Sequence, residues 1–556
     1  MKPGIYLRNE AGGVFIHIKC DFEDRERCKS VLGAWWSKKT KTWRYPGFAV
    51  FDVIREFPEL PCSPGVLEWR KKLHNIVTWN KEVKRGNHPC EAPPPEWLYM
   101  HQQVAYHLLM CNPDFALFMD MGTGKTVAVL TALDALGDRT LVVTRSALIY
   151  SAWLEDIEER FPWLLGSTIP WQGSKRKRKY EKQIRRGTNV RIILTNFDTY
   201  RNDWDFLRSC GCKILVVDES SILKDPKKKT ATDKLRTPER LIRHARQPEV
   251  ERRIIMSGCP APNSPLEYYQ QVQFLDPSVM GDSYYRFRLQ WCHQTDRLGY
   301  KYDMTTEKKN KMLDRISAIS YVISKDECLD LPERTFTPVK MDMHEAQAKA
   351  YRQMLRDLIM QHEAGEIEAG RVVTQIMKLR QITSGFAYYR EEEDIDDRKT
   401  AWIGSPKYKE LENLLSDIGD EQAIIWRHFD EEGKRLAELL GDKAVDYSPL
   451  KDGEKPQALK DFKKGKYQYL IAHPASLGHG VTLVNCRYAI YFSLSNSYEQ
   501  YIQSIDRIYR AGQKHNTQIF FLMCNKTIDE EIYYESLSGK QKMSNMGLNY
   551  LKKEAK

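Results

Sequence analysis

The chain has 556 residues, enough for about three or four domains with separate cores. Lys and Arg outnumber Asp and Glu by 86 to 75, which gives a formal net charge of +11 and favours a polyanionic partner. No apolar run is long enough to span a membrane, and the N-terminus lacks a signal-peptide core. The 12 cysteines lack C-x-x-C spacing, which predicts reduced thiols of an intracellular protein rather than zinc ligands or disulfides.

Residues 1–60 predict a small α/β module of short strands and one helix. Its segment GAWWSKKTKTWRYP predicts a strand, a turn carrying Lys38 and Lys39, and a returning strand carrying Trp43. In a domain of this size the aromatic residues fill the core. The alternative is that the turn contacts phosphates while an aromatic ring stacks on an exposed base. Residues 61–95 predict a charged helix and then a proline-rich, extended linker.

The rest of the chain predicts two α/β lobes with a helical insertion between them. Residues 96–277 alternate helical stretches with the apolar runs FALFM, TLVVT, VRIILT, KILVVD and RRIIMSG, as in a parallel sheet buried on both faces. Residues 278–400 are mostly helical and charged, which predicts protrusions and a linker. Residues 401–530 resume the alternation with QAIIWRH, YQYLIAHP, YAIYFSL and TQIFFLMC, and residues 531–556 form a polar helical tail.

A candidate phosphate-binding turn follows the first of these runs, in FALFMDMGTGKTV. Backbone N–H groups at a helix N-terminus bind phosphates, Lys125 adds a charge for the β- and γ-phosphates, and the Thr126 hydroxyl can bind Mg²⁺. Met119 replaces the first glycine of the usual pattern, so a chance glycine-rich turn is the alternative. The candidate nucleotide-binding residues are Gly122, Thr123, Gly124, Lys125 and Thr126.

The segment KILVVDESS places two carboxylates just after a buried strand, where ligand sites form in α/β sheets. We expect Asp218 to hold Mg²⁺, directly or through water, and Glu219 to orient and deprotonate the attacking water. The alternative is that the four polar residues cap a loop.

Five segments, MDMGTGKT, LVVTRSALIYSAW, ILTNFDTYR, VVDESSILKDPKKKT and IIMSGCPAPNS, follow the order and spacing of superfamily 2 helicase motifs. They most resemble those of Swi/Snf-type DNA translocases. LYMHQQVAYHLL resembles the family's nucleotide-base motif, in which Gln102 matches the glutamine that reads adenine, so the resemblance implies ATP and Mg²⁺ as cofactors. Ser257 and Gly258 match the motif that couples hydrolysis to lobe movement. The departures are Ser221, where many relatives have His, and Cys259, where Thr is usual.

The second lobe contains SYEQYIQSIDRIYRAGQK, where Gln503, Arg507 and Arg510 lie at offsets of four and three. On a helix this spacing aligns all three on one face, and two arginines on one face suit a γ-phosphate. A surface helix with solvated arginines is the alternative. The segment resembles the family's arginine-finger motif, which implies catalytic roles for Arg507 and Arg510 and a coupling role for Gln503. IAHPASLGHGVTLVNC resembles the motif that contacts DNA and senses nucleotide, with Gly480 at the position of its characteristic glycine. The sequence of this segment suggests a compact bacterial or phage-type relative.

Three features bear on nucleic acid. Arg145, Thr195 and Asn196 match positions that contact the sugar-phosphate backbone in motor relatives. The basic run at 175–186 fits DNA contact, a solvated helix or a nuclear-import signal. Residues 5–58 resemble the HARP (HepA-related protein) module of annealing helicases, which implies recognition of forked or branched DNA.

The resemblance therefore implies a DNA-dependent ATPase that translocates on duplex DNA and remodels, anneals or branch-migrates forked or branched DNA. ATP is expected in a cleft between the lobes. The alternatives are a strand-separating DNA or RNA helicase and a catalytically inactive nucleic-acid-binding scaffold. We expect no membrane association, and a location in the cytoplasm of a bacterial or phage-infected cell, or in the nucleus of a eukaryote.

Overall fold

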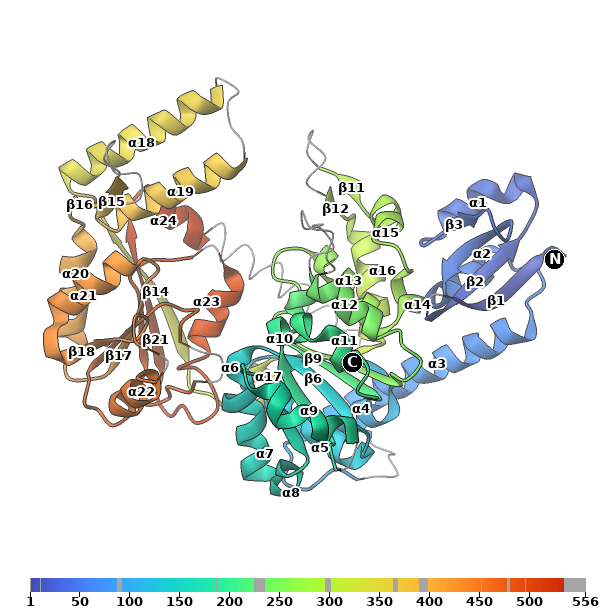
Figure 1. The fold of residues 1–556 in the computed structure, drawn as a ribbon. Helices are drawn as coiled ribbons and strands as arrows, with labels where there is room; N and C mark the ends of the chain where they lie inside the picture. The colour runs from blue at the N-terminus through green and yellow to red at the C-terminus, as the bar shows by residue number, and fades with distance from the viewer. Residues whose placement is uncertain are drawn as a thin grey trace. The chain divides into compact units, whose positions relative to one another are not determined.

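The chain folds into two compact units, each built on its own parallel sheet (Figure 1). Among the described residues, the first unit extends to Cys328 and the second begins at Leu329. Two parallel-sheet lobes confirm the predicted α/β class. The computed structural model describes residues 2–10, 12–87, 93–186, 189–224, 236–295, 302–363, 369–389, 399–451, 453–477, 481–495 and 497–534.

The first unit begins with a four-stranded antiparallel sheet in the order β1-β2-β4-β3. The predicted hairpin is present, because β3 pairs antiparallel with β4 and residues 38–41 form the turn. The core of this module includes Ile16 and Tyr45. Its elements are β1 (Gly4–Glu10), β2 (Gly13–Lys19), η1 (Phe22–Asp24), α1 (Arg25–Ser30), β3 (Trp35–Ser37), β4 (Thr42–Pro46), η2 (Gly47–Ala49) and α2 (Val50–Glu56).

A long helix, α3 (Pro64–Lys84), connects this module to the parallel sheet. Near its start the Trp69 indole donates to the Gly47 carbonyl at 3.0 Å. Near its end Asn80 donates to the Ala318 carbonyl at 2.9 Å. The helix predicted between the module and the first lobe is therefore confirmed, and it packs at both ends. Part of the predicted extended linker, residues 88–92, lies outside the described residues.

The first lobe contains a seven-stranded, all-parallel sheet in the order β13-β5-β10-β9-β6-β8-β7. All five predicted strands are present. The short strand β7 is additional, and β13 comes from the segment expected to be helical. The strands are β5 (Asp114–Met119), β6 (Thr140–Thr144), β7 (Thr168–Pro170), β8 (Ile192–Asn196), β9 (Ile214–Asp218), β10 (Arg252–Met256) and β13 (Ser320–Ile323).

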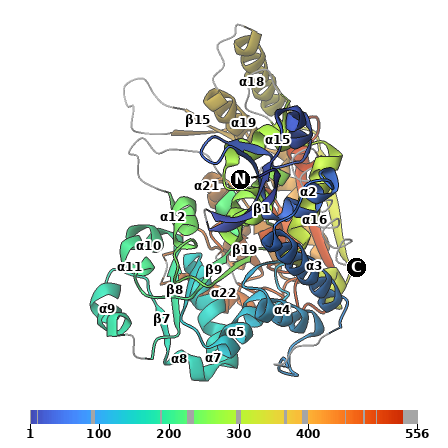
Figure 2. The same ribbon diagram turned by 90° about the vertical axis from the view of Figure 1, so that its right-hand side faces the viewer.

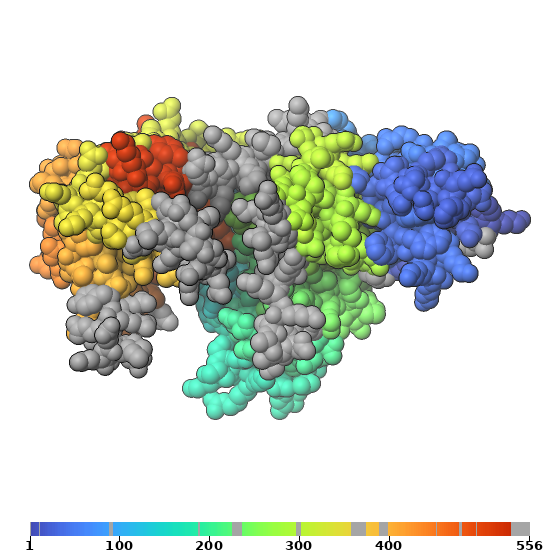
Figure 3. Space-filling view, turned by 90° about the horizontal axis from the view of Figure 1, so that it is seen from above, coloured from blue at the N-terminus to red at the C-terminus, as the bar shows by residue number. Residues whose placement is uncertain are grey.

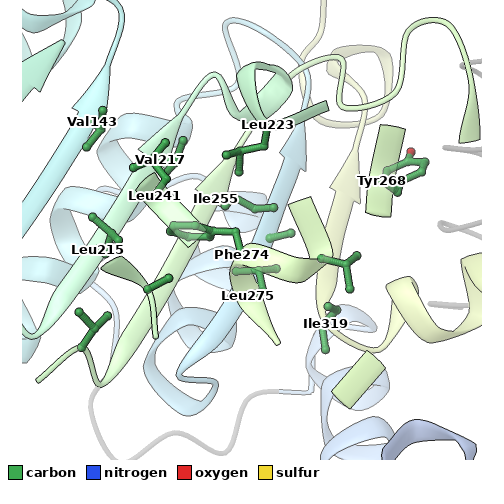
Figure 4. Packing of buried hydrophobic residues seen from close by; sticks show 14 of the residues in the cluster. Val143, Leu215, Val217, Leu223, Leu241, Ile255, Tyr268, Phe274, Leu275 and Ile319 are labelled. Carbon is green, nitrogen blue, oxygen red and sulfur yellow. The ribbon is translucent and has the colours of Figure 1, made fainter. Parts of the chain in front are cut away.

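This sheet is buried on both faces, as the unbroken apolar runs predict. Successive side chains of a strand point to opposite faces. Leu215 and Val217 accordingly join one hydrophobic cluster, shown in Figure 4, whereas Val216 joins the other. The helices of the lobe are α4 (Met100–Cys111), α5 (Lys125–Leu136), α6 (Ser146–Leu148), η3 (Ile149–Leu154), α7 (Glu155–Arg160), α8 (Pro162–Leu165), α9 (Arg176–Arg186), α10 (Phe197–Asn202), α11 (Trp204–Arg208), η4 (Ser220–Lys224), α12 (Thr237–His244), η5 (Pro265–Glu267), α13 (Tyr268–Leu275) and α17 (Lys325–Cys328).

A helical insertion lies between β10 and β13, and the N-terminal module packs against it (Figure 3). Arg44 of the module pairs with Asp282 at 3.0 Å, and Asp52 pairs with Lys311 at 2.9 Å. The insertion consists of α14 (Pro277–Met280), α15 (Tyr284–Trp291), β11 (His293–Gln294), β12 (Tyr302–Asp303) and α16 (Thr306–Ser317).

The second unit contains a six-stranded, all-parallel sheet in the order β14-β21-β20-β17-β19-β18. The four predicted strands are confirmed. The edge strand β14 was not expected, because it lies in the segment predicted as protrusions and linker. The strands are β14 (Arg334–Met341), β17 (Ala423–Trp426), β18 (Ala444–Asp446), β19 (Tyr469–Ala472), β20 (Tyr488–Tyr491) and β21 (Thr517–Cys524).

Helices α18 and α19 lie side by side and project from this sheet (Figure 1). The predicted C-terminal tail lies outside the described residues from 535 onward. In the part of the chain that the structure describes, no helix is long and apolar enough to cross a membrane. The remaining elements are α18 (Glu345–Glu363), α19 (Ala369–Thr383), β15 (Phe386–Tyr389), β16 (Lys399–Trp402), α20 (Pro406–Ile418), α21 (Asp430–Leu440), η6 (Gly441–Lys443), α22 (Lys455–Lys463), α23 (Tyr498–Ile505) and α24 (Ile528–Glu531).

Candidate nucleotide and nucleic-acid sites

The predicted phosphate-binding turn joins the end of β5 to the start of α5. Gly122 and Gly124 have φ angles of +82° and +78°, which side-chain-bearing residues rarely adopt. A Cβ atom at Gly124 would lie 2.1 Å from the Gln102 amide nitrogen, so space also requires glycine there. The backbone N–H groups of the first turn of α5 are left for a phosphate, as in other helix N-termini that bind anions.

The Lys125 ammonium lies across this turn. Its Nζ donates to the carbonyl oxygens of Met119 at 2.8 Å and Asp120 at 3.0 Å. Thr126, the second residue of α5, is half-buried, and the Thr123 hydroxyl donates to the Asp120 carbonyl at 2.7 Å. The lysine, the glycine turn and the helix N-terminus therefore lie together, an arrangement that suits phosphate binding.

Gln102, the predicted adenine reader, braces the same turn. Its Oε1 accepts the N–H of Tyr99 at 3.1 Å, and its Nε2 donates to the Thr123 carbonyl at 3.1 Å. The His101 ring Nε2 lies 2.8 Å from that carbonyl. The adenine contact of Gln102 stays a prediction. Tyr99 is 64% exposed and stacks on His101 with an interplanar angle of 7°, a platform beside the turn that sequence reasoning missed.

Asp218 ends β9 as a buried, oriented carboxylate. Its Oδ2 accepts the Thr144 hydroxyl at 2.9 Å and the Trp153 indole at 3.0 Å. Its Oδ1 accepts the N–H of Glu219 at 2.9 Å. These three hydrogen bonds fix the orientation of the carboxylate at the end of the strand. The sequence did not single out Thr144 or Trp153 as supports, although both lie in a segment that resembles a helicase motif.

Glu219 has a φ angle of +56° and is buried. A non-glycine residue in this region costs on the order of 1–3 kcal/mol, and such residues cluster at functional sites. The turn takes Glu219 out of the strand geometry that Asp218 keeps, as the prediction of different roles requires. Among the described residues no group of three or more His, Cys, Asp or Glu side chains could hold a metal. A Mg²⁺ ion bound with a nucleotide needs only one or two ligands from the protein, because waters and the substrate phosphates supply the others.

The predicted coupling residues lie against the phosphate-binding turn. Ser257 is buried just after β10, and its hydroxyl oxygen accepts the N–H of Cys259 at 3.1 Å. A Cβ atom at Gly258 would lie 3.0 Å from Met121 Cγ and 3.2 Å from Met121 N. This contact places the motif after β10 directly beside the turn after β5.

Gln271 in α13 joins two of these motifs, and sequence reasoning missed it. The side chain is fully buried. Its Oε1 accepts the Ser220 hydroxyl at 2.7 Å, and its Nε2 donates to the Pro260 carbonyl at 2.7 Å. One amide thus connects the loop after β9 to the loop after β10.

The predicted helix over the two arginines is wrong in its extent. α23 ends at Ile505, so Arg507 and Arg510 lie in the turns that follow. The Arg507 carbonyl accepts the N–H of Leu483 at 2.8 Å, a bond to a distant segment that replaces the helical ladder. Gln503, still in the helix, is buried and donates to the Glu499 carboxylate at 3.3 Å.

The side chain of Arg507 is only 6% exposed, whereas Arg510 is half-buried. Gly480, the predicted glycine of the neighbouring motif, lies outside the described residues. The catalytic roles of the two arginines stay predictions.

The three predicted backbone-contact residues lie at the carboxyl ends of two adjacent strands. Arg145 is half-exposed after β6. Asn196 ends β8, accepts the Thr199 N–H at 2.8 Å and donates to the Gln172 side chain at 3.3 Å. Thr195 is fully buried and its hydroxyl donates to a backbone carbonyl at 3.1 Å. A phosphate contact from the Thr195 hydroxyl is therefore wrong, because strand alternation turns this side chain into the core.

In the N-terminal hairpin, Lys38 and Lys39 are exposed at the turn. Trp43 is half-buried and lies edge-on to Trp36, with ring centroids 5.6 Å apart. Trp36 is 43% exposed. The ring most accessible to a base is therefore that of Trp36 rather than the predicted Trp43.

Comparison with known families gives two matches in chain order. A model described as "SNF2-related domain" matches residues 74–385. A model described as "Helicase conserved C-terminal domain" matches residues 406–512. Together they contain the phosphate-binding turn, the acidic pair and the arginine segment.

Several curated proteins resemble most of the chain. Protein p41 of Acyrthosiphon pisum secondary endosymbiont phage 1 is 24% identical over 78% of this chain and 94% of its own length. The DNA repair and recombination protein RAD54 of Oryza sativa is 23% identical over 75% of this chain. The chain spans 47% of the rice protein and 48% of the mouse chromodomain-helicase-DNA-binding protein 1-like, so it covers about half of these relatives. Among solved structures, the Sulfolobus solfataricus SWI2/SNF2 ATPase core in complex with dsDNA aligns over 83% of this chain and 96% of that chain, with 20% identity and a TM-score of 0.37.

Proposed function

The chain belongs to the SNF2-related family and is an ATP-hydrolysing enzyme of superfamily 2; on this premise we propose a DNA-dependent ATPase that translocates on duplex DNA and remodels, anneals or branch-migrates forked or branched DNA. One observation carries the proposal. The phosphate-binding turn, the coupling motif and the acidic pair follow β5, β10 and β9, three adjacent parallel strands. The carboxyl ends of such strands meet at one edge of the sheet, where ligands bind.

In this mechanism Lys125 and the N–H groups at the start of α5 bind the β- and γ-phosphates. Thr126 and Asp218 would hold Mg²⁺, which neutralises the phosphate charge when bound. Glu219 orients the attacking water and accepts its proton. Arg507 and Arg510 of the second unit would complete the site and stabilise the charge of the transition state. Hydrolysis then removes the group that both units bind, so each cycle changes their grip on DNA.

Three features support DNA as the partner. The chain has an excess of basic residues. Its relatives include proteins named for DNA repair, recombination and chromatin remodelling. The N-terminal hairpin presents Lys38 and Lys39 beside the exposed Trp36, which suits contact with a phosphate and an unpaired base. The resemblance of this module to the HARP module supports branched rather than uniform duplex DNA as the substrate. We propose a location in the cytoplasm of a bacterial or phage-infected cell, or in the nucleus of a eukaryote.

Replacement of Glu219 by Gln should lower DNA-stimulated ATP turnover by about 100-fold or more, since it removes the proposed base. Lys125→Ala should abolish turnover through loss of phosphate binding. Both variants should still bind DNA, because neither residue lies among the proposed DNA contacts. ATP hydrolysis and DNA binding are measured in parallel, with the exposed Glu249→Gln as a control of normal turnover. Near-normal hydrolysis by either variant would remove the assigned role.

The same turnover assay, run with linear duplex, forked DNA, single-stranded DNA and RNA, separates the proposal from its alternatives. Forked and duplex DNA should stimulate most, and a chain with Lys38→Gln and Lys39→Gln should lose the preference for forks. Stimulation by single strands or RNA alone would indicate a strand-separating helicase. Absence of hydrolysis with every nucleic acid would indicate an inactive scaffold.

A further inference from the structure

Helix α9 carries the densest basic run of the chain and lies at the outer edge of the first unit, beside β7 and α11 (Figure 2). One of its residues, Ile184, is buried and fixes which face is inward. Apart from Lys179, whose ammonium lies 4.7 Å from the centroid of the Tyr180 ring, the basic residues of this segment fall into two groups with different surroundings.

The first group holds the helix in place. Arg176 Nε donates to Asp203 Oδ2 at 2.6 Å, and Lys177 lies 3.2 Å from Asp203 Oδ1. The Trp171 indole donates to the same carboxylate at 2.9 Å. Burial raises the pKa of Asp203, but these hydrogen bonds outweigh it and hold the pKa below its usual value. Arg185 is likewise paired with a carboxylate of the helix at 2.8 Å.

The second group forms an exposed stripe. At about 100° per residue, its members fall within an arc of about 80° that points directly away from Ile184. All are exposed, and in the described part of the chain none has an ion pair within 4.0 Å. This stripe consists of Lys175, directly before the helix, and of Arg178, Lys182 and Arg186 within it.

The stripe begins at the edge of the sheet that carries the candidate backbone contacts. Gln172, three residues before Lys175, accepts hydrogen bonds from Ser146 at 3.2 Å and from Asn196 at 3.3 Å. Ser146 directly follows Arg145. The segments after β6, β7 and β8 are thus joined by side-chain bonds, and α9 extends from the last residues of that joined edge.

We propose that the stripe on α9 is an additional binding surface for the sugar-phosphate backbone of DNA, continuous with the edge formed by Arg145 and Asn196. The choice of DNA as its ligand rests on the proposed function. Basic side chains that are not paired with a described carboxylate of this chain, and that are spaced along one exposed face, suit a regular polyanion. Contacts of this kind with phosphates carry no information about base sequence. The basic run then adds affinity and processivity rather than sequence choice.

The test compares two double variants of the full chain by their DNA affinity as a function of salt, without nucleotide. Arg178→Gln with Lys182→Gln removes two charges of the stripe. Lys177→Gln with Arg185→Gln removes two charges from the same helix that are already paired with carboxylates. Each lost phosphate contact makes the slope of log K against log salt shallower by about 0.9, so the stripe variant should lose about 1.8. The paired-residue variant should change the slope by less than half of this.

Equal slopes for both double variants would overturn the proposal, because they would show a diffuse effect of net charge. An unchanged slope for the stripe variant would also overturn it and direct the search to an acidic protein. Circular dichroism of each variant controls for loss of the helix. The outcome is separable from the proposed function: if DNA fails to stimulate ATP hydrolysis but the stripe variant alone changes the slope, the binding surface stands and the motor function fails.

Discussion

At the scale of single residues, Gln271 offers the sharpest test of how the site is coupled. Gln271→Leu keeps the volume but removes three hydrogen bonds, to the Ser220 hydroxyl and to the Pro260 and Glu267 carbonyls. Leaving these buried groups unpaired costs about 1–3 kcal/mol of stability. The loops after β9 and β10 should then move independently, so DNA-stimulated turnover should fall several-fold more than basal turnover, with little change in KM for ATP. Steady-state kinetics with and without DNA measure this.

The adjacent Gln270→Leu is the matched control, because Gln270 is half-buried on the same helix and should leave the ratio of stimulated to basal turnover unchanged. An equal loss of basal and stimulated turnover in Gln271→Leu would show that the amide serves stability alone.

Some residues of the site could be predicted from the local sequence, whereas the role of others depends on contacts between distant segments. The glycines at 122 and 124 could be predicted, because a local turn demands their positive φ angles. The roles of Thr144 and Trp153 could not be predicted, because both side chains act through hydrogen bonds to Asp218, which is 74 and 65 residues away in the chain. Thr195 was misassigned for the same reason, since only the packed sheet shows its side chain to be internal.

At the scale of elements, the central strands followed from their apolar runs, whereas the edges and one helix end did not. β14 is partly exposed and contains Pro338, features of an edge strand that weaken the apolar signal. The helical pattern around the two arginines continues in sequence beyond Ile505, but the bond from Leu483 to the Arg507 carbonyl ends the helix. Such long-range bonds leave no periodic trace in the sequence.

The end of α12 should make the first unit sensitive to acid. The His244 ring stacks on Tyr200, and its Nδ1 lies 3.1 Å from the Tyr200 hydroxyl. Burial, with a smaller effect of Arg208, lowers the pKa of His244 to about 4 from 6.5. The native state therefore holds the ring neutral, and this contribution is complete above pH 6.5 and is lost as the pH falls towards 4. The full effect is about 3 kcal/mol.

Between pH 6.5 and 4, the urea concentration at the midpoint of unfolding should decrease less in His244→Gln than in the parent chain. Intrinsic fluorescence measures the unfolding transition. The exposed His74→Gln should leave the slope as in the parent chain. An unchanged slope in His244→Gln would mean that other groups carry the acid sensitivity.

At the scale of the whole molecule, the order of module, helix and two lobes could be predicted, but the docking of the module could not. Proline-rich and charged segments favour a loosely tethered module. The structure instead anchors the module to the insertion by ion pairs between residues more than 200 positions apart, such as Arg44 with Asp282. Pairs at such separation have no local sequence signature.

This docking predicts that the module and the insertion lose stability together. Asp52 lies 2.9 Å from Lys311 and 3.5 Å from Arg315, whose side chain is 6% exposed. Burial lowers the pKa of Arg315 to about 10, and the Asp52 carboxylate opposes that effect. Asp52→Asn leaves a buried guanidinium without its counter-charge, which should cost about 3 kcal/mol. Hydrogen exchange should therefore accelerate in α2 and α16 alike. Asp198→Asn, at an exposed surface pair, is the control and should leave both helices protected. Faster exchange in α2 alone would mean that the module opens independently, so the insertion would not hold its hairpin rigidly on the first unit.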